Sequence, residues 1–253
     1  MASVKTKALV IREAPYQDND KLLTLFTEKY GKQRAIARGA RRRKGSLRSV
    51  TQLFSYARFM YFEGKNFANI SDGTLIESFY PLRGNVIQMT LASYIAELLD
   101  DFYDFYQGDP EMLKAVTHIF YYWSEHLAQN DGALAACFQL KLMRIQGLGP
   151  VLPRCVRCGA HQEALTGFSI ADGGTVCQKC MKPSDIPLDP GLLKDMQDWM
   201  QQPIKNICHK KWQAANVQKG LDLMDRYITA QLGHPTKSYR FYKELTEQKG
   251  IQN

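Results

Sequence analysis

The stretch Asp20-Lys-Leu-Leu-Thr-Leu-Phe-Thr-Glu-Lys-Tyr-Gly-Lys-Gln-Arg-Ala-Ile-Ala-Arg38 holds two short apolar runs on either side of a Tyr30-Gly31-Lys32 turn. This pattern is typical of a β-hairpin and predicts strands over residues 21–27 and 33–38. Similar runs occupy residues 4–11, 53–62 and 67–77, the last broken by Ser71-Asp72-Gly73. Five short strands without a long helix between them predict a small, closed antiparallel barrel of the OB-fold type, although an SH3-like barrel would give nearly the same pattern.

After Pro81 the spacing of apolar residues changes from two to 3.6, which indicates helices. We expect helices over residues 87–102, from Pro110 behind an Asp109 cap, over residues 132–146, from Asp189-Pro190, and over residues 217–232. The predicted class is α+β and multidomain. The expected division is an OB-fold domain over residues 1–80, a helical body over residues 81–152 and 185–253, and an inserted cysteine module over residues 153–184.

The composition excludes several classes of protein. The chain has 253 residues, of which 45% are hydrophobic and 23% are charged, so it is neither disordered nor fibrous. Its longest stretch without Lys, Arg, Asp or Glu is residues 84–96, which is only 13 residues long. A membrane-spanning helix needs roughly 20 apolar residues. With no apolar leader at the N-terminus, we expect a cytoplasmic protein.

The positive charge is concentrated in the first third of the chain. Residues 1–80 hold 15 Lys/Arg and 7 Asp/Glu, whereas residues 81–253 hold 18 of each. The densest run is Arg38-Gly-Ala-Arg-Arg-Arg-Lys-Gly-Ser-Leu-Arg48, with six cations and no acid. This asymmetry favours nucleic acid as the partner; an anionic membrane surface, a solvated run or a localisation signal are the alternatives.

The predicted nucleic-acid-binding residues lie on this loop and on the strand before it. Lys32, Arg34 and Arg38 alternate along the strand, so we expect them to project from one face. A surface that neutralises phosphates predicts salt-sensitive, sequence-independent binding. The full set is Lys32, Arg34, Arg38, Arg41, Arg42, Arg43, Lys44 and Arg48.

The fourth predicted strand has two apolar faces. Phe54, Tyr56, Arg58, Met60 and Phe62 form one face, and Leu53, Phe59 and Tyr61 form the other. One face belongs to the core, while aromatic rings on the other would stack on unpaired bases. Periodicity alone does not distinguish the two faces.

Four of the six cysteines form two pairs, Cys155-x-x-Cys158 and Cys177-x-x-Cys180, separated by 18 residues. This spacing is typical of a structural zinc site, in which four thiolates close a tetrahedral shell around one Zn²⁺ ion. Two disulfides are the alternative, and a reducing compartment disfavours them. Residues 165–170 and 172–176 are expected to form two short strands between the pairs.

An enzymatic interpretation of the same region is weaker. His161-x-Glu163 followed by Cys177-x-x-Cys180 partly matches the signature of zinc nucleobase deaminases, but Val176 stands where that signature has Pro. The chain has neither a G-x-x-x-x-G-K-[ST] nor a G-x-G-x-x-G motif, which disfavours nucleotide hydrolysis and dinucleotide chemistry. We therefore expect a protein that is not an enzyme.

Several motifs together resemble the bacterial recombination mediator family RecO. Ala37-Arg-Gly-Ala-Arg41 with Ser46-x-x-Ser49 and Leu53-Phe54 resembles the third strand and basic loop of the family. Residues 20–27 with Tyr30-Gly-Lys32 resemble its second hairpin. The stretches 94–99 and 140–147, the second followed by Pro150 and Cys155, are similar to its helical domain and to its approach to the zinc module.

This resemblance implies an OB-fold, a helical body and an inserted zinc module in a protein without enzymatic turnover. Members of the family bind single- and double-stranded DNA and anneal complementary strands. With RecR they help to load the RecA recombinase onto DNA coated by single-strand-binding protein, whose acidic C-terminal tail they contact. The resemblance places the protein in the bacterial cytoplasm, associated with the nucleoid. It gives the DNA role to Arg38, Arg41, Arg42, Arg43, Lys44 and Arg48, and the metal role to Cys155, Cys158, Cys177 and Cys180.

The main alternative function is an RNA-binding factor of translation or transcription, because barrels and zinc ribbons also occur together in that class. A preference for structured RNA over single-stranded DNA would distinguish it.

Overall fold

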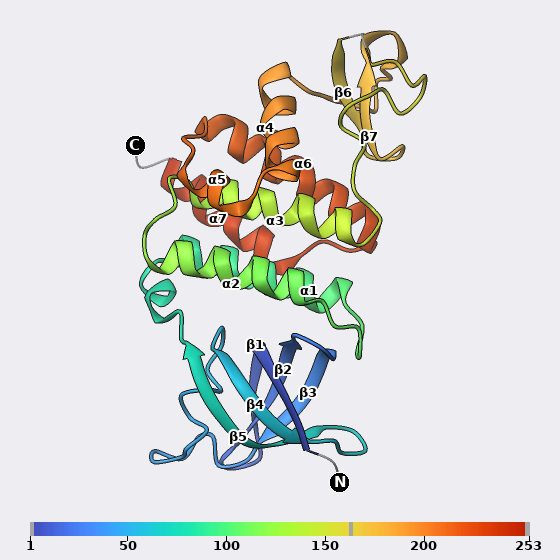
Figure 1. Ribbon diagram of the computed structural model, residues 1–253. Helices are drawn as coiled ribbons and strands as arrows, with labels where there is room; N and C mark the ends of the chain where they lie inside the picture. The colour runs from blue at the N-terminus through green and yellow to red at the C-terminus, as the bar shows by residue number, and fades with distance from the viewer. Residues whose placement is uncertain (1–2, 162–163, 251–253) are drawn as a thin grey trace. The chain divides into compact units, whose positions relative to one another are not determined.

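The computed structural model describes residues 3–161 and 164–250, and the chain forms two compact units, Met1–Glu125 and His126–Asn253 (Figure 1). The first unit contains a β-barrel and two α-helices. The second contains a small sheet, the four paired cysteines and five α-helices within the described residues. The predicted fold class, a barrel with a helical body and a cysteine module, is confirmed, while the domain boundaries at residues 80, 152 and 184 stay predictions.

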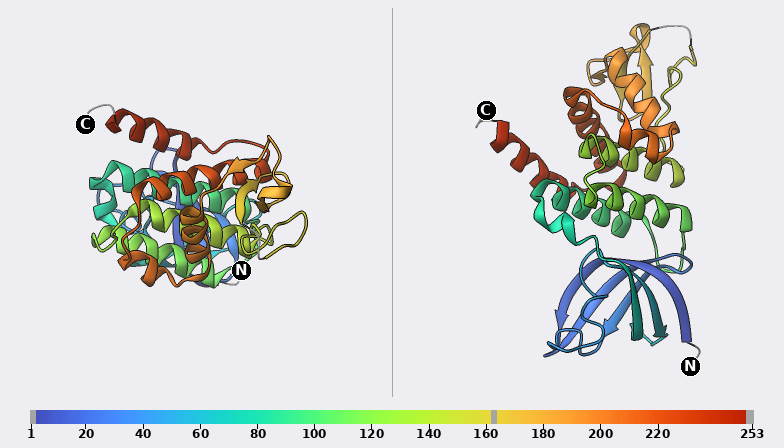
Figure 2. Two further views of the ribbon diagram at one scale, coloured as in Figure 1. Left: turned by 90° about the horizontal axis from the view of Figure 1, so that it is seen from above. Right: turned by 60° about the vertical axis from the view of Figure 1, so that its left-hand side comes forward.

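The first five strands form the expected closed barrel, which the right-hand view in Figure 2 shows from the side. Their order around the barrel is β1-β2-β3-β5-β4. All neighbouring pairs are antiparallel except β3 and β5, which are parallel, so the expectation of a wholly antiparallel unit was wrong. A ring of five strands cannot alternate in direction throughout, so one pair must be parallel. The strands are β1 Ser3–Tyr16, β2 Asp20–Thr27, β3 Gly31–Ala37, β4 Tyr56–Phe62 and β5 Ala68–Glu77.

The structure distinguishes the two faces of β4. Ala57, Phe59 and Tyr61 are buried in the barrel core, so Arg58, Met60 and the other alternating residues face outward. Phe54 belongs to neither face, because it precedes the strand in a left-handed conformation with φ 66° and is buried. Ser71-Asp72-Gly73 does not break β5, because a bulge accommodates the extra residue there.

Helices α1 (Val86–Phe102) and α2 (Pro110–Ser124) cover one end of the barrel, after the 3-10 turn η1 (Tyr80–Gly84) (Figure 1). Aromatic rings join the barrel to these helices in edge-to-face contacts. The ring centroids of Phe26 and Tyr103 are 4.8 Å apart, and those of Phe54 and Phe120 are 5.3 Å apart. As predicted, Asp109 caps α2, and its carboxylate accepts a hydrogen bond of 2.8 Å from the Met112 amide.

The second unit packs its helices around α3 (Asp131–Ile145), which is buried along most of its length. The predicted helices α4 (Pro190–Gln201), capped by Asp189, and α6 (Ala214–Leu232), which ends at Gly233 with φ 77°, are confirmed. Helices α5 (Ile204–His209) and α7 (Lys237–Gly250) were not predicted. Within the described residues, none of the helices has the length and apolar character needed to span a membrane.

The small sheet has the order β7-β6-β8 and forms around the cysteines. β6 (Leu165–Ser169) and β7 (Gly174–Cys177) are the two predicted strands, and β8 (Ile186–Pro187) adds a third. The sheet contacts α6 through Phe168, whose ring lies edge to face with Tyr227 at 5.8 Å.

Candidate metal centre and nucleic-acid interface

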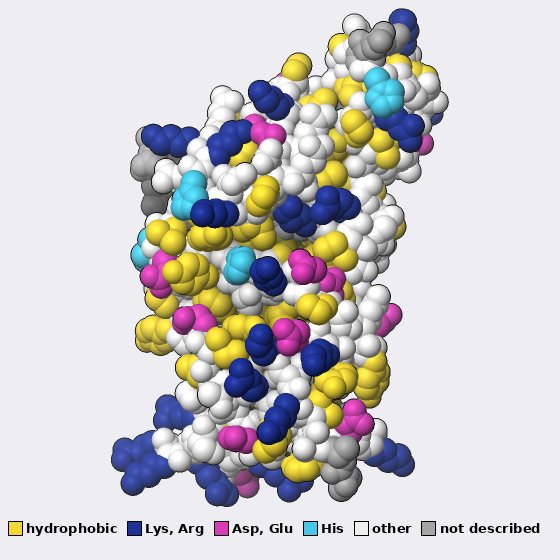
Figure 3. Space-filling view, in the orientation of Figure 1, with side chains coloured by type: hydrophobic (Ala, Val, Ile, Leu, Met, Phe, Trp, Pro, Cys, Tyr) yellow, Lys and Arg dark blue, Asp and Glu magenta, His cyan; other side chains and the backbone are white. Residues whose placement is uncertain are grey.

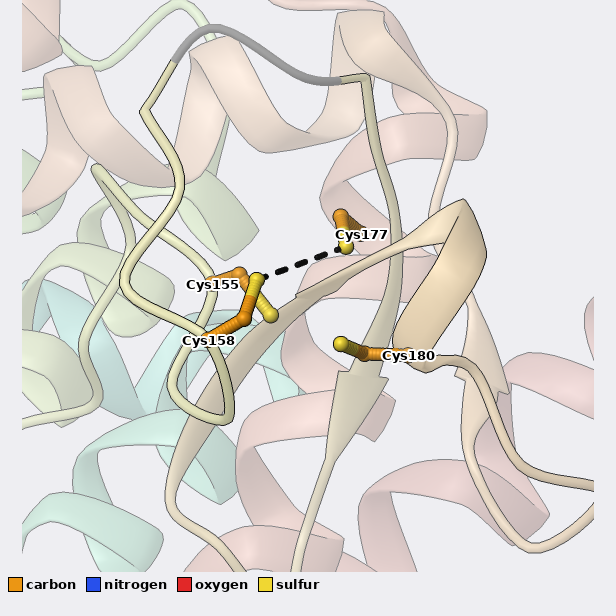
Figure 4. Close-up of side chains that lie close together, drawn as sticks. All are labelled: Cys155, Cys158, Cys177 and Cys180. Carbon is orange, nitrogen blue, oxygen red and sulfur yellow. Dashed lines mark hydrogen bonds between the residues drawn. The ribbon is translucent and has the colours of Figure 1, made fainter.

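The four predicted metal ligands lie together in the cysteine module. Cys155 and Cys158 come from the turn before β6, Cys177 is the last residue of β7, and Cys180 ends the 3-10 turn η2 (Gln178–Cys180). Their sulfur atoms point toward one another and all lie within 4.8 Å of each other (Figure 4). The Cys158 and Cys177 sulfurs are 3.8 Å apart.

This donor set fits one zinc ion. With Zn–S bonds of about 2.3 Å, a regular tetrahedron places neighbouring sulfurs about 3.8 Å apart. The measured separation of Cys158 and Cys177 matches that spacing. Four thiolates fill all four positions, so a metal held here has a structural role and no open coordination site for a substrate.

The electrostatics of the four thiols also suit a cation. Burial favours the neutral form of Cys155, but backbone N–H groups of Cys177, Cys158 and Arg157 outweigh it and lower its pKa to about 6. Cys180 responds oppositely, because hydrogen bonds to Cys158 and Cys177 raise its pKa to about 12. One thiolate therefore forms readily while further ionisation is opposed, and a divalent cation relieves this opposition.

Sequence reasoning missed Arg157, which lies between the two cysteines of the first pair. Its guanidinium donates to both carboxylate oxygens of Asp185, at 2.6 and 2.8 Å, and to the Cys180 carbonyl. It also donates to Asp172 at 2.8 Å. The Asp185 carboxylate is only 1% exposed, and its hydrogen bonds with Arg157 lower its pKa to about 2. An arginine inside a C-x-x-C turn and an aspartate five residues after the second pair were the only available signals.

The arrangement does not support the deaminase interpretation. His161 is exposed and is not part of the cysteine cluster, while Glu163 lies outside the described residues. The cluster within the described residues is complete with four thiols.

The basic loop, residues 38–48, is built into the barrel. Ala40, Leu47 and the nearby Val50 are buried in the barrel core, and successive turns bring these residues inward. The six cations of the loop are all exposed, and among the described residues none of them forms an ion pair. Within the described part of the chain, the hydrogen bonds of the Arg41 and Arg48 side chains go to backbone carbonyls. In Figure 3, Lys and Arg side chains gather around the lower end of the barrel.

The structure separates the two candidate cations on β3. Arg34 is exposed and forms no ion pair with a described residue, as a phosphate contact requires. Lys32 is only 12% exposed, and its ammonium group pairs with the Asp100 carboxylate at 3.1 Å. Both side chains lie over the Phe105 ring, which confirms that they share one face of the strand.

Comparison with known proteins identifies the family. The models "Recombination protein O N terminal" and "Recombination protein O C terminal" match residues 1–79 and 83–240. A curated relative, DNA repair protein RecO of Clostridium novyi (strain NT), is 35% identical over 241 residues, or 95% of this chain and 94% of the relative. DNA repair protein RecO of Oceanobacillus iheyensis is 30% identical over 243 residues, which cover 95% of this chain and 93% of that protein. The chain therefore belongs to the recombination protein O (RecO) family of DNA repair and recombination proteins.

Proposed function

We propose that this protein is a recombination mediator without enzymatic turnover. It binds single- and double-stranded DNA through the basic loop and anneals complementary strands. Together with RecR it helps RecA to load onto DNA coated by single-strand-binding protein, whose acidic C-terminal tail it contacts. It acts in the bacterial cytoplasm, at the nucleoid. Family membership supports this role, and the chemistry of the first unit is consistent with it.

One observation carries the DNA role. Six exposed cations without ion-pair partners among the described residues stand on a loop whose apolar side chains are fixed in the barrel core. Cations that are not neutralised within the protein are available for phosphates, and a fixed loop loses little conformational freedom when it binds. Two complementary strands repel each other through their phosphates, so a surface that screens this charge accelerates annealing without nucleotide.

The cysteine module supports this function through stability. We assign one structural Zn²⁺ ion to Cys155, Cys158, Cys177 and Cys180, whose geometry fits tetrahedral thiolate coordination. When bound, the ion joins the two C-x-x-C turns and stabilises the fold of the module. In this proposal it takes part in no reaction.

The test is the rate at which two complementary DNA strands, coated with the host's single-strand-binding protein, anneal without nucleotide. The test variant is Arg41→Gln/Arg42→Gln/Arg43→Gln. The matched control is Lys194→Gln/Lys205→Gln/Lys211→Gln, which removes three exposed cations from the second unit.

We expect the wild type and the control to accelerate annealing and the loop variant to lose most of the acceleration. Equal rates for both variants would remove the basic loop from the proposal. A wild-type protein that leaves annealing unchanged but binds structured RNA tightly would be an RNA-binding factor instead.

A further inference from the structure

A groove of about 270 Å³ lies in the first unit, between β3, the turn from β4 to β5, and the segment that follows α1. We call it the aromatic groove. Three rings line it, from Phe67, Phe105 and Tyr106, with the cations Arg34 and Lys65 and a single acid, Glu63. Phe105 is 40% exposed and Tyr106 is 74% exposed, so the groove presents aromatic surface to solvent.

The segment that carries two of the rings is fixed to the barrel. Phe105 forms isolated β-bridges with Gly31 and Lys32, at the start of β3. The chain then passes so close to the turn before β3 that a Cβ atom on Gly108 would lie 2.3 Å from the Lys29 carbonyl oxygen. Only glycine fits there, so this close approach defines where the aromatic residues stand.

The ring of Phe105 contacts two cations. The Lys32 ammonium lies 5.1 Å from the ring centroid, and the Arg34 guanidinium carbon lies 5.4 Å from it. These are cation–π distances. Because Lys32 is paired with Asp100, the exposed Arg34 is the cation beside this ring that is free to meet a phosphate.

Tyr106 adds a second, independent observation. Its backbone is left-handed, with φ 69°, a region that residues other than glycine rarely adopt. Such conformations persist where the surrounding structure enforces them, and they cluster at binding sites. Because the side chain is three-quarters exposed, burial of the ring does not explain the conformation.

We infer that the aromatic groove binds unpaired bases of single-stranded DNA, with bases stacked on Phe105 and Tyr106 and phosphates beside Arg34 and Lys65. This inference rests on the proposed DNA-binding function. A stacked, paired duplex does not offer its base faces to such rings, whereas a single strand does. The groove therefore adds a preference for single strands to the basic loop, which binds phosphates of either form.

One strand of DNA can reach both surfaces. Arg34 is in the groove and Arg38 begins the basic loop, four residues further along the chain. At about 3.3 Å per residue of extended chain, they are separated by about 13 Å. This difference favours release of the annealed product, because the duplex loses its contacts with the groove and keeps only those with the loop.

The experiment compares binding of a single strand and of a duplex of equal length by the full chain. The test variant is Phe105→Leu/Tyr106→Leu, which keeps apolar volume but removes the rings. Tyr80→Leu/Phe241→Leu is the matched control, because these rings are 69% and 50% exposed and lie outside the groove. Tyr106→Leu alone is a second test variant, since its exposed side chain contributes little to folding.

We expect Tyr106→Leu, which removes one stacking ring, to bind the single strand about 5-fold to 150-fold more weakly, the range that corresponds to the loss of one stacked base, and the double variant to bind it more weakly still. Duplex binding should be unchanged. A strand in which abasic residues replace the central nucleotides keeps its phosphates, so the wild type and the double variant should bind it equally. A 2-aminopurine base in a normal strand should be quenched by the wild type and less by Tyr106→Leu.

Unchanged single-strand affinity in both test variants, with the wild type still binding DNA, would overturn the groove and leave the proposed function intact. Equal losses for single strand and duplex would also overturn it, because the rings would then not select unpaired bases. A wild type that binds neither form of DNA would refute the proposed function itself. Tighter binding of single-stranded RNA, lost on ring removal, would overturn the assignment to DNA.

Discussion

Arg157 and Asp185 are joined by two hydrogen bonds, of 2.6 and 2.8 Å, between the guanidinium group and the carboxylate. The pair links the turn that carries Cys155 and Cys158 to the chain beyond Cys180. The two halves of the cysteine module are therefore connected by a contact that does not pass through a metal.

Removing this contact should destabilise the module even when zinc is bound. We expect Asp185→Asn to lower the free energy of unfolding by about 1.5–3 kcal/mol, the usual value of hydrogen bonds to a charged group. Urea unfolding of the metal-loaded protein measures the loss. The control is Asp198→Asn, whose pair with Lys210 is more exposed and should contribute less than about 1 kcal/mol. Equal effects of the two substitutions would contradict a special role for Asp185.

The cysteine cluster should hold one zinc ion per chain. Chelation should expose four thiols to a thiol reagent, while the buried Cys137 and Cys208 stay protected until the protein unfolds. Cys177→Ser/Cys180→Ser should lose the metal and lower the melting temperature first, and weaken DNA binding only as a consequence. Elemental analysis and calorimetry measure these effects, and a double variant with full thermal stability would argue against the site.

Cys137 should make stability depend on alkaline pH. Burial raises the pKa of its thiol from the ordinary value of 9.0 to about 12. The folded state therefore keeps a proton that the unfolded chain releases above pH 9. The contribution of the neutral Cys137 thiol to the free energy of unfolding is complete below about pH 9. It is lost at about 1.4 kcal/mol per pH unit as the pH rises toward 12. Unfolding at pH 8 and 10.5 should show a smaller loss in Cys137→Ala than in the wild type; parallel losses would contradict this.

The basic loop should determine the salt dependence of DNA binding. Each cation that contacts a phosphate of a single strand contributes about 0.7 to the slope of log affinity against log salt concentration. If all three arginines make such contacts, Arg41→Gln/Arg42→Gln/Arg43→Gln should flatten the slope by about 2. Fluorescence anisotropy over a salt series measures it, and an unchanged slope would show that the loop does not touch phosphate.

Substitutions of Lys32 and Arg34 should have different effects on DNA binding and on stability, although the two residues alternate on one strand. Arg34→Gln should flatten the salt slope by about 0.7 with little effect on folding. Lys32→Gln removes one of the two cations that pair with Asp100, the other being Arg12, so it should destabilise the protein and change the slope less. Measuring both quantities for both variants decides between a phosphate contact and an internal ion pair at residue 32.

Local signals were sufficient for much of the fold and for the clustering of the four cysteines. The cysteine spacing, the Asp109-Pro110 and Asp189-Pro190 caps and the stop at Gly233 are short-range chemistry, and all appear where the sequence predicts them. The loop cations too were identified from composition alone, and the structure adds that their loop is fixed in the barrel core.

The features that were missed depend on residues far apart in the chain. The salt bridge between Arg157 and Asp185 spans 28 residues, and no local pattern indicates it. Phe54 looked like a strand residue because it is aromatic, but its burial beside Phe120 outweighs that tendency. Helix α7 is polar overall, and its packing depends on two buried tyrosines, Tyr239 and Tyr242.

The aromatic contacts within the first unit determine where an N-terminal fragment of the protein can end and still fold. The N-terminal family match ends at residue 79, close to the end of the barrel. Yet Phe26, Phe54 and Phe79 meet their partner rings on Tyr103 and Phe120, beyond that point. A fragment that ends at residue 80 would expose these three phenylalanine rings to solvent and should aggregate. A fragment that ends at Glu125 keeps both rings of each contact. The N-terminal family match, residues 1–79, is thus shorter than the segment that we expect to fold and remain soluble by itself, residues 1–125.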